Sequence, residues 1–199
     1  SGSYNTFVGM SAGYGGTTSA PYSSGQYNVA MGYEALKAFT TTGGITAIGS
    51  YALTANTTGI NTAVGYQALK ASTSNTQNTA LGYNAGQNLT ANNNVAIGHQ
   101  ATDNGTSATG NVSVGYRALR YNVTGDYNIA IGQEALQGSS GQSHSNNVAI
   151  GHQAGKLLTT GAANVLIGYN AGKSTTGYSG NTVMGYQAMS NTAPGRSNV

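Results

Sequence analysis

One short unit recurs along this chain from end to end at a nearly constant spacing. The phrase NNVAIGHQA occurs at 93–101 and again, unchanged, at 146–154, and it contains one version of that unit. Eleven copies begin at Asn5, Asn28, Ile45, Asn61, Asn78, Asn94, Asn111, Asn128, Asn147, Asn164 and Asn181. Successive copies are mostly 16 or 17 residues apart, and a twelfth copy begins at Asn198. A period of this kind is typical of solenoids, so we predict a single repeat domain over residues 1–199.

Each position of the unit accepts few residue types. Counted from the first residue, position 2 is always Thr, Val or Ile and position 4 is always Val, Ile, Leu or Met. Position 3 is usually Ala, position 5 is always Gly and position 8 is always Ala. β-Branched residues favour strands, and alternate strand residues share a face. Both faces are therefore small or apolar, which predicts a strand that is covered on both sides.

Three columns of identical residues are expected where the coils stack. The structural residues are Asn28, Asn61, Asn94 and Asn147 at position 1, Gly32, Gly65, Gly98 and Gly151 at position 5, and Ala35, Ala68, Ala101 and Ala154 at position 8. We expect the asparagines at a turn, where the side-chain amide bonds to neighbouring backbone and left-handed angles are tolerated. Gly and Ala allow another backbone to approach closely.

The stretches between the units are polar and rich in turn residues. A segment such as 70–77 can hold a second short strand with bends. A helix starting at YEALKAF is rejected, because Thr, Ser, Asn and Gly interrupt it within a few residues. The predicted fold is therefore an all-β, parallel β-solenoid of about eleven coils. Stacking at ~4.8 Å per coil gives a rod of about 50 Å.

A single copy of such a rod has a thin core. Each coil offers only two or three sizeable apolar side chains, for instance Val64, Tyr66 and Leu69. Burying a Val or Leu contributes about 1.5–3 kcal/mol, whereas ordering each residue costs about 1–2 kcal/mol. The second apolar face therefore needs a cover. A symmetric partner of the same sequence is the natural source, so we predict a homo-oligomer.

The phrases NVAIG and NTAVGYQAL resemble the repeats of two groups of fibrous proteins. One is the head of trimeric autotransporter adhesins, a left-handed parallel β-roll in a three-chain bundle. The other is the repeat of bacteriophage tail fibres, which often precedes a self-cleaving chaperone domain. The resemblance covers essentially the whole chain, and the Tyr-Gln-Ala-Leu ending favours the tail-fibre group. It implies a homotrimer and an extracellular location, on a virion tail fibre or a cell surface.

Several kinds of chemistry are not expected. Charged residues are 6% of the chain, Cys is absent, and the basic residues form no run that would suit nucleic acid. No apolar run approaches the ~18 residues that span a bilayer, so no membrane insertion is expected. The four acids belong to different units, and neither a GxSxG elbow nor a phosphate-binding GxxxxGK[ST] motif occurs. We expect no enzyme activity, no metal site and no cofactor.

The two histidines of the repeated phrase share position 6 with six tyrosines. His99 and His152 are therefore interpreted as members of a column that accepts planar side chains. They lie three coils apart, too far for one metal ion within a chain.

Two units are longer than the others, with insertions near 14–27 and 138–145. Insertions in a solenoid map to surface loops, so these are the predicted recognition sites, for a cell-surface glycan or a protein receptor. The residues that would carry recognition are Pro21, Tyr22, Tyr27 and His144. Five sequons occur, and one of them begins at the repeat residue Asn111, which is expected inward or at a turn. The other four offer asparagines for glycosylation, namely Asn56, Asn88, Asn104 and Asn122.

Three functions fit these observations. The first is a non-enzymatic segment of a trimeric surface fibre, a fragment of a longer chain, that spaces and presents a receptor-binding region. The second is a secreted filament whose subunits stack end to end, because the chain starts and finishes in nearly the same phase of the repeat. The third is a solenoid that binds ice or glycan.

Overall fold

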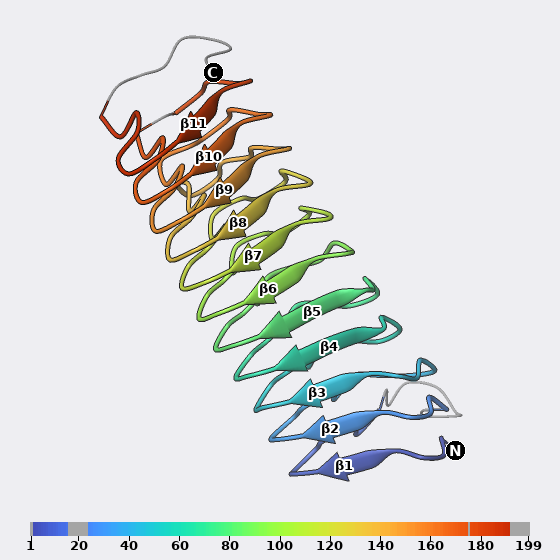
Figure 1. The fold of residues 1–199 in the computed structure, drawn as a ribbon. Helices are drawn as coiled ribbons and strands as arrows, with labels where there is room; N and C mark the ends of the chain where they lie inside the picture. Colours follow the sequence, from blue (N-terminus) through green and yellow to red (C-terminus); the bar gives the residue numbers. More distant parts are fainter. Residues whose placement is uncertain (1, 16–23, 175, 192–199) are drawn as a thin grey trace.

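The computed structural model describes residues 2–15, 24–174 and 176–191, and these form one straight stack of coils (Figure 1). Eleven parallel strands form a single sheet in chain order among the described residues, so the first and last strands lie at opposite ends of the rod. The strands are β1 (Thr6–Val8), β2 (Val29–Met31), β3 (Thr46–Ile48), β4 (Asn61–Val64), β5 (Asn78–Leu81), β6 (Val95–Ile97), β7 (Val112–Val114), β8 (Ile129–Ile131), β9 (Val148–Ile150), β10 (Val165–Ile167) and β11 (Thr182–Met184). The predicted all-β parallel solenoid is confirmed.

The strand register follows the repeat. Ala63 of β4 pairs with Ala47 on one side and with Ala80 on the other, so position 3 stacks on position 3. The longer units do not disturb this order, because β8 pairs with β9 through Ile129 and Val148 across the second insertion. The additional residues are therefore accommodated outside the strand ladder.

One face of each strand builds the core. The alanines at positions 3 and 8 are almost completely buried except in the two end coils, where Ala12 and Ala188 are partly buried. Most coils add a large apolar side chain to them. This side chain comes from position 9 in some coils, as in Leu69, and from position 12 in others, as in Leu89. Where position 12 is Leu, position 9 is Gly, as in Gly86. In these coils Leu occupies one of the two sites and a small residue the other, whereas the second coil fills both sites, with Leu36 and Phe39.

The tenth coil fills its layer in a third way. Leu166 replaces the usual alanine at position 3 and is 1% exposed, and position 9 of this coil is Gly172. A Cβ atom added to Gly172 would lie 2.8 Å from Cδ2 of Leu166. A large residue at position 3 or 12 accompanies glycine at position 9 in these coils, and this relation is seen in the sequence only when several units are compared.

The asparagine column lies inside the stack and not at a left-handed turn. Asn94 is 1% exposed, and the left-handed residue is its predecessor, Asn93, with φ of 62°. The Oδ1 atom of Asn94 accepts a hydrogen bond of 3.0 Å from the backbone N–H of Asn111. Oδ1 of Asn111 in turn accepts 2.8 Å from the N–H of Asn128. The expected bonding of the amide to backbone is present, but the expected left-handed angles belong to the preceding residue.

The segment after each strand forms turns instead of the expected second strand. Within the described residues each coil contributes one strand, positions 6 to 9 are turns in every coil, and in most coils the run of turns continues to position 11. Gln67 and Leu69 have φ of 56° and 50°, which costs energy for residues with a Cβ atom. Their backbone N–H groups donate to carbonyl groups of the two adjacent coils, Ser50 and Ala85, at 3.0 Å each. Stacking therefore stabilises a conformation that an isolated segment would avoid.

Glycine at position 5 is required by both angle and space. Gly98 has φ of 128°, and a Cβ atom there would lie 2.5 Å from the carbonyl oxygen of Gly115 in the next coil. The backbone turns out of the strand at this point and touches its neighbour directly. This explains why position 5 is invariant along the chain.

Candidate functional site

The strand side chains at positions 2 and 4 face away from the core and form the aliphatic stripe. The stripe runs along the rod from Thr6 and Val8 in β1 to Thr182 and Met184 in β11. Leu81 is 49% exposed, and Ile131 and Ile150 are 38% exposed each. The prediction that the strand is covered on both faces therefore holds for one face only within a single chain.

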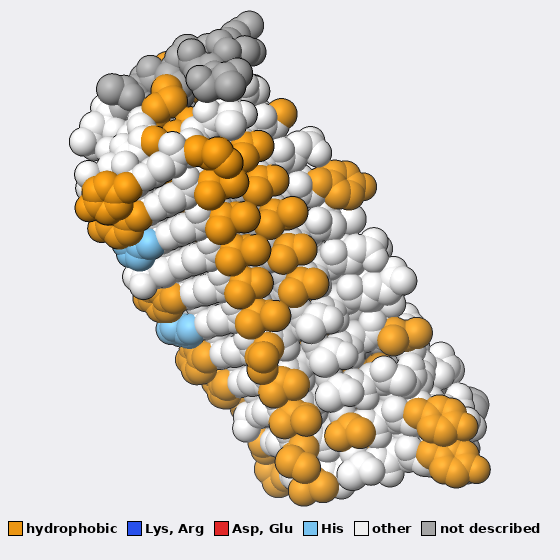
Figure 2. All heavy atoms as spheres, viewed as in Figure 1, with side chains coloured by type: hydrophobic (Ala, Val, Ile, Leu, Met, Phe, Trp, Pro, Cys, Tyr) orange, Lys and Arg blue, Asp and Glu red, His pale blue; other side chains and the backbone are white. Residues whose placement is uncertain are grey.

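Figure 2 shows this stripe as a continuous column of hydrophobic side chains, which becomes two adjacent columns toward the C-terminal end. No Lys, Arg, Asp or Glu side chain is visible on the same face. An apolar surface without charge is the composition found at the centre of protein interfaces. Soluble monomers rarely expose a contiguous apolar patch of this length.

A second surface, the aromatic edge, consists of positions 6, 7 and 10 and borders the sheet where the strands end. Rings at this edge stack from coil to coil with centroid separations of 5.0–6.0 Å. The first run comprises Tyr33, Tyr51, Tyr66, Tyr83, His99 and Tyr116, and the second comprises His152, Tyr169 and Tyr186. Gln133 occupies position 6 between the two runs. Both histidines thus lie in a row with the tyrosines, as predicted from their shared position 6.

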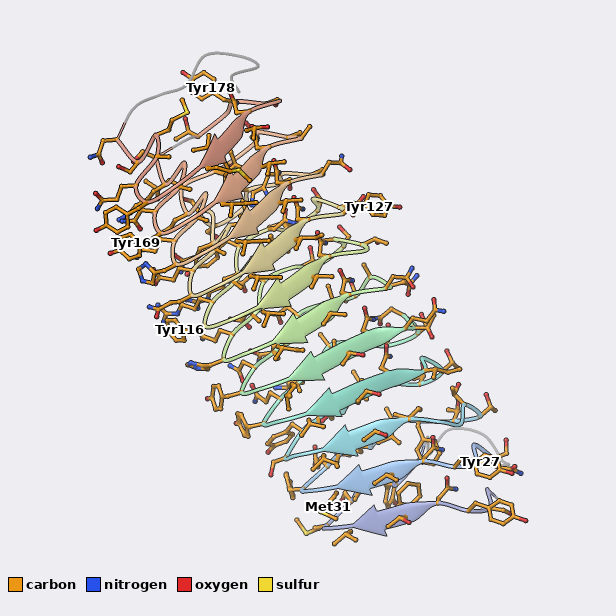
Figure 3. All side chains as sticks on the ribbon, in the orientation of Figure 1. Tyr27, Met31, Tyr116, Tyr127, Tyr169 and Tyr178 are labelled. Carbon is orange, nitrogen blue, oxygen red and sulfur yellow. The ribbon has the colours of Figure 1, made fainter. Side chains whose placement is uncertain are left out.

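The two edges of the rod carry different aromatic residues. Tyr116 and Tyr169 project from the edge at the strand ends, whereas Tyr27 and Tyr127 project from the opposite edge, where the strands begin (Figure 3). Tyr27 is 64% exposed and stacks on Tyr4 at a centroid separation of 5.2 Å. Of the predicted recognition residues in the first insertion, Tyr27 is therefore exposed, and Pro21 and Tyr22 lie outside the described residues.

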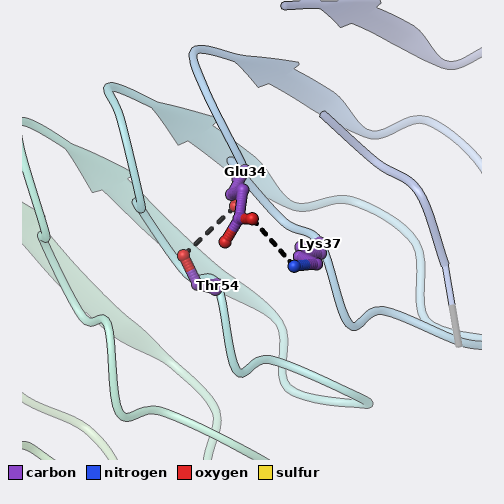
Figure 4. A network of polar contacts seen from close by, with 3 residues as sticks. All are labelled: Glu34, Lys37 and Thr54. Atoms are coloured by element: carbon purple, nitrogen blue, oxygen red, sulfur yellow. Dashed lines mark hydrogen bonds and ion pairs between the residues drawn. The ribbon is translucent and has the colours of Figure 1, made fainter. Parts of the chain in front are cut away.

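Ion pairs connect positions 7 and 10 of the aromatic edge. Lys37 Nζ lies 2.8 Å from Glu34 Oε1, and Thr54 of the next coil donates to the backbone carbonyl of Glu34 (Figure 4). The hydrogen bond from Lys37 lowers the pKa of Glu34, and the same bond raises the pKa of Lys37. The charge of Glu34 raises the pKa of the Tyr33 hydroxyl. Charged and aromatic groups therefore interact directly along this edge.

Two further ion pairs join neighbouring coils along the same edge. Lys156 Nζ lies 2.8 Å from Glu134 Oε2, and this hydrogen bond lowers the pKa of Glu134. Arg120 Nε lies 3.5 Å from Asp103 Oδ2. Burial raises the pKa of Asp103, and the nearby charge of Arg120 opposes that shift. Each of the three carboxylates on this edge, Glu34, Asp103 and Glu134, therefore forms an ion pair with a neighbouring Lys or Arg side chain.

The structure corrects the expectation for His144. The second insertion was predicted to present this residue for recognition, but its side chain is 1% exposed. Its backbone follows the path of the shorter coils, because its carbonyl accepts a 2.7 Å hydrogen bond from Asn128 Nδ2. Neither ring nitrogen makes a hydrogen bond to the described residues, and burial lowers the pKa of His144 to about 4. The imidazole is therefore a neutral core side chain.

The sequon asparagines fall into two groups. Asn56 and Asn122 are 0% exposed, and their amides bond to the backbone of Gly59 and Gly125, respectively. A glycan on either nitrogen is incompatible with this packing. Two others, Asn88 and Asn104, are half-buried and stack on each other, with 3.4 Å between Nδ2 and Oδ1. The prediction of glycosylation stays open for this second pair alone.

Within the described residues, no three His, Cys, Asp or Glu side chains gather where they could hold a metal ion. The part of the chain that the structure describes also contains no helix long and apolar enough to cross a bilayer. No family model, curated protein or solved structure matches this chain.

Proposed function

We propose that this chain is a non-enzymatic structural segment of a trimeric surface fibre that spaces and presents a receptor-binding region. The kind of fibre is that of a phage tail fibre or an adhesin head, as the resemblance of the repeats implies. The observation that carries the proposal is the aliphatic stripe. In β2 to β11 one face of the strand is packed, and the other is uncharged, largely apolar and open along the rod.

The stripe is well suited to a lateral contact between copies. Association costs on the order of 4–15 kcal/mol, and full burial of one Val or Ile side chain contributes about 1.5–3 kcal/mol. Because eleven strands each present two stripe positions, even partial burial per coil exceeds that cost. Copies related by a rotation axis parallel to the rod would place stripe beside stripe over its whole length.

The backbone supports the spacing role. Every coil is bonded to the next through the strand ladder, and the asparagine side chains add a second line of hydrogen bonds inside the stack. Such a stack has no interruption among its strands at which the rod would bend. Because Cys is absent, its stability is independent of redox conditions, which suits an extracellular position.

Sedimentation equilibrium tests the assembly. We expect a discrete particle of three times the chain mass of 20.0 kDa. Ile150→Asp should dissociate it, because a carboxylate in the centre of an apolar contact is left without a partner. Leu157→Asp is the matched control, because Leu157 is 39% exposed, close to the 38% of Ile150, and lies off the stripe.

The outcomes separate the alternatives. A stable monomer with an intact β spectrum would overturn the proposal. Growth without a limiting mass would favour the end-to-end filament instead. A trimer that dissociates equally with Leu157→Asp would place the contact somewhere other than the aliphatic stripe.

A further inference from the structure

We propose that the aromatic edge binds an elongated acidic glycan that lies along the rod with about one sugar per coil. Assembly through the aliphatic stripe does not require this edge, so the inference goes beyond the fibre role. It rests on four features of this edge: its rings, its side-chain amides, its charge and the distance at which the rings repeat.

The first feature is a row of exposed rings, in one run of six and one run of three. Tyr66 and Tyr83 are 39% and 49% exposed, and their centroids lie 5.1 Å apart. The row continues even where position 6 is not aromatic. In the third coil position 6 is Ser50, and Tyr51 at position 7 contacts both Tyr33 and Tyr66. Partly exposed aromatic rings provide apolar surface with a polar end, which suits the apolar faces and hydroxyl groups of sugars.

The second feature is a row of side-chain amides beside the rings. Most coils carry Gln or Asn at position 7, as in Gln67, Asn84, Gln100 and Gln153. An amide both donates and accepts hydrogen bonds, as sugar hydroxyls also do. Nε2 of Gln67 donates to the Tyr66 hydroxyl at 3.1 Å, so the amide and ring rows are in contact.

The third feature is the distribution of charge. All six Lys and Arg residues of the described part of the chain lie at position 7 or 10, and three of the four acids lie there too. The edge therefore carries a net charge of six minus three, or +3. The six are Lys37, Lys70, Arg117, Arg120, Lys156 and Lys173.

Half of these cations are not used in ion pairs. Lys37, Arg120 and Lys156 pair with carboxylates. Lys70 and Arg117 instead lie over the rings of Tyr51 and Tyr116, with 5.6 Å and 4.8 Å to the ring centroids. These cations are held beside the aromatic row without a carboxylate among the described residues. Carboxylate or sulfate groups of a glycan would complement them.

The fourth feature is the period itself. Neighbouring rings repeat at 5.0–5.4 Å over most of the edge. An extended β-1,4-linked chain of hexoses advances by nearly one strand spacing per sugar. Successive sugars would therefore meet equivalent groups on successive coils. Contacts that are weak for one sugar would add up along the polymer.

Nucleic acid fits the same edge less well. Its backbone carries a phosphate at every nucleotide, and its affinity depends on many neutralising contacts. The edge offers three unpaired cations spread over many coils, with uncharged amides between them. Sparse charge with abundant hydrogen-bonding groups matches an acidic sugar polymer better.

Calorimetry with two probes of equal length tests the inference on the assembled protein. The probes are an oligomannuronate of six sugars and neutral cellohexaose. We expect the acidic probe to bind about tenfold more tightly at low ionic strength, and this difference should shrink as salt is added. Equal binding of the two probes, or no binding of either, would overturn the proposal, as would tighter binding of single-stranded DNA.

Variants locate the binding to the edge. The double change Tyr66→Ala with Tyr83→Ala should weaken binding of the acidic probe about tenfold, and Lys70→Gln should weaken it several-fold. Tyr127→Ala on the opposite edge is the control, because Tyr127 is 64% exposed. Rings that only stabilise the stack would change the melting temperature and leave the affinity intact, which contradicts the proposal. The mass of the particle, measured in parallel, shows whether assembly is retained and so tests the fibre role separately.

Discussion

The N-terminal and C-terminal halves of the aliphatic stripe share one backbone but differ at position 2. In β3, β4 and β5 this position is Thr, whereas in β6 to β10 it is Val or Ile. The exposed column at position 4 is apolar in both halves. The stripe is therefore two apolar residues wide from β6 to β10 and one residue wide from β3 to β5, while β2 and β11 depart from this division with Val29 and Thr182. Figure 2 shows the wider part as two adjacent columns.

The aromatic edge is distributed the opposite way. Its long run of six rings lies in the N-terminal half and the middle, and its short run of three lies near the C-terminal end. The backbone repeats uniformly along the rod, but the two halves differ in their surface side chains. If copies associate through the aliphatic stripe as proposed, we expect the C-terminal half to contribute most to that contact; if the aromatic edge binds glycan as proposed, we expect the longer binding surface toward the N-terminal half.

The largest effect is expected in the core, where the halves should behave alike. Leu69→Ala in the fourth coil and Leu166→Ala in the tenth should each lower the free energy of unfolding by about 2–5 kcal/mol. Each change leaves a cavity, because one large side chain fills the layer. Denaturant unfolding measures this, with the exposed Leu157→Ala as a control that should cost less than about 0.5 kcal/mol. A small effect at either core site would mean that the halves differ in packing as well as in surface.

Acid should weaken the C-terminal half selectively through His144. The folded pKa is about 4 and the ordinary value is 6.5, so the unfolded chain binds the additional proton between these values. Stability is therefore lost as the pH falls through this window, by up to roughly 3 kcal/mol. His144→Leu should remove that part of the pH dependence, whereas titration of the carboxylates remains in both proteins. Hydrogen exchange should show faster opening near β8 and β9; uniform loosening of the rod would contradict the assignment.

Charges placed on the stripe should reveal its unequal halves. The pair Ile131→Asp and Ile150→Asp should raise the dissociation constant of the assembly about 100-fold. The corresponding pair Ile48→Asp and Val64→Asp should raise it about tenfold, because neighbouring threonine hydroxyls can hydrogen-bond to the carboxylates. Sedimentation over a range of concentrations gives both values. If the two pairs have equal effects, the width of the stripe does not determine its contribution.

The smallest effect is expected when threonines of the N-terminal half of the stripe are replaced by valine. Thr62→Val and Thr79→Val give the N-terminal half the residues of the C-terminal half without changing the size of the side chain much. Each should tighten association a few-fold, because a hydroxyl that the proposed contact between copies would bury is replaced by a methyl group. The same assay applies, with Thr90→Val on the loop side of the rod as a control. Weaker association of the stripe variants would show that the hydroxyls themselves make contacts between subunits.

Several features of the surfaces were not predictable from the repeat. The row of planar residues at position 6 was visible in the sequence, but the joining of Tyr51 to it depends on the left-handed conformation at position 7, where φ is 62°. The collection of the cations on one edge depends on the same turns, which bring positions 7 and 10 together. His144 appeared to be a loop residue because the insertion lengthens the unit, yet the additional residues are taken up before it and its side chain enters the core.

The sequence alone determined the number of coils, their register and the all-β character, because a constant period places identical residues above one another. Glycine at position 5 adds to this, since the lack of a Cβ atom allows the backbones of successive coils to touch. Which face of the sheet is covered was decided by the tertiary structure. Small or apolar residues occupy both faces, so alternation cannot distinguish them. The turns after each strand place position 8 beside position 3, so that position 3 faces the core and positions 2 and 4 are left outside.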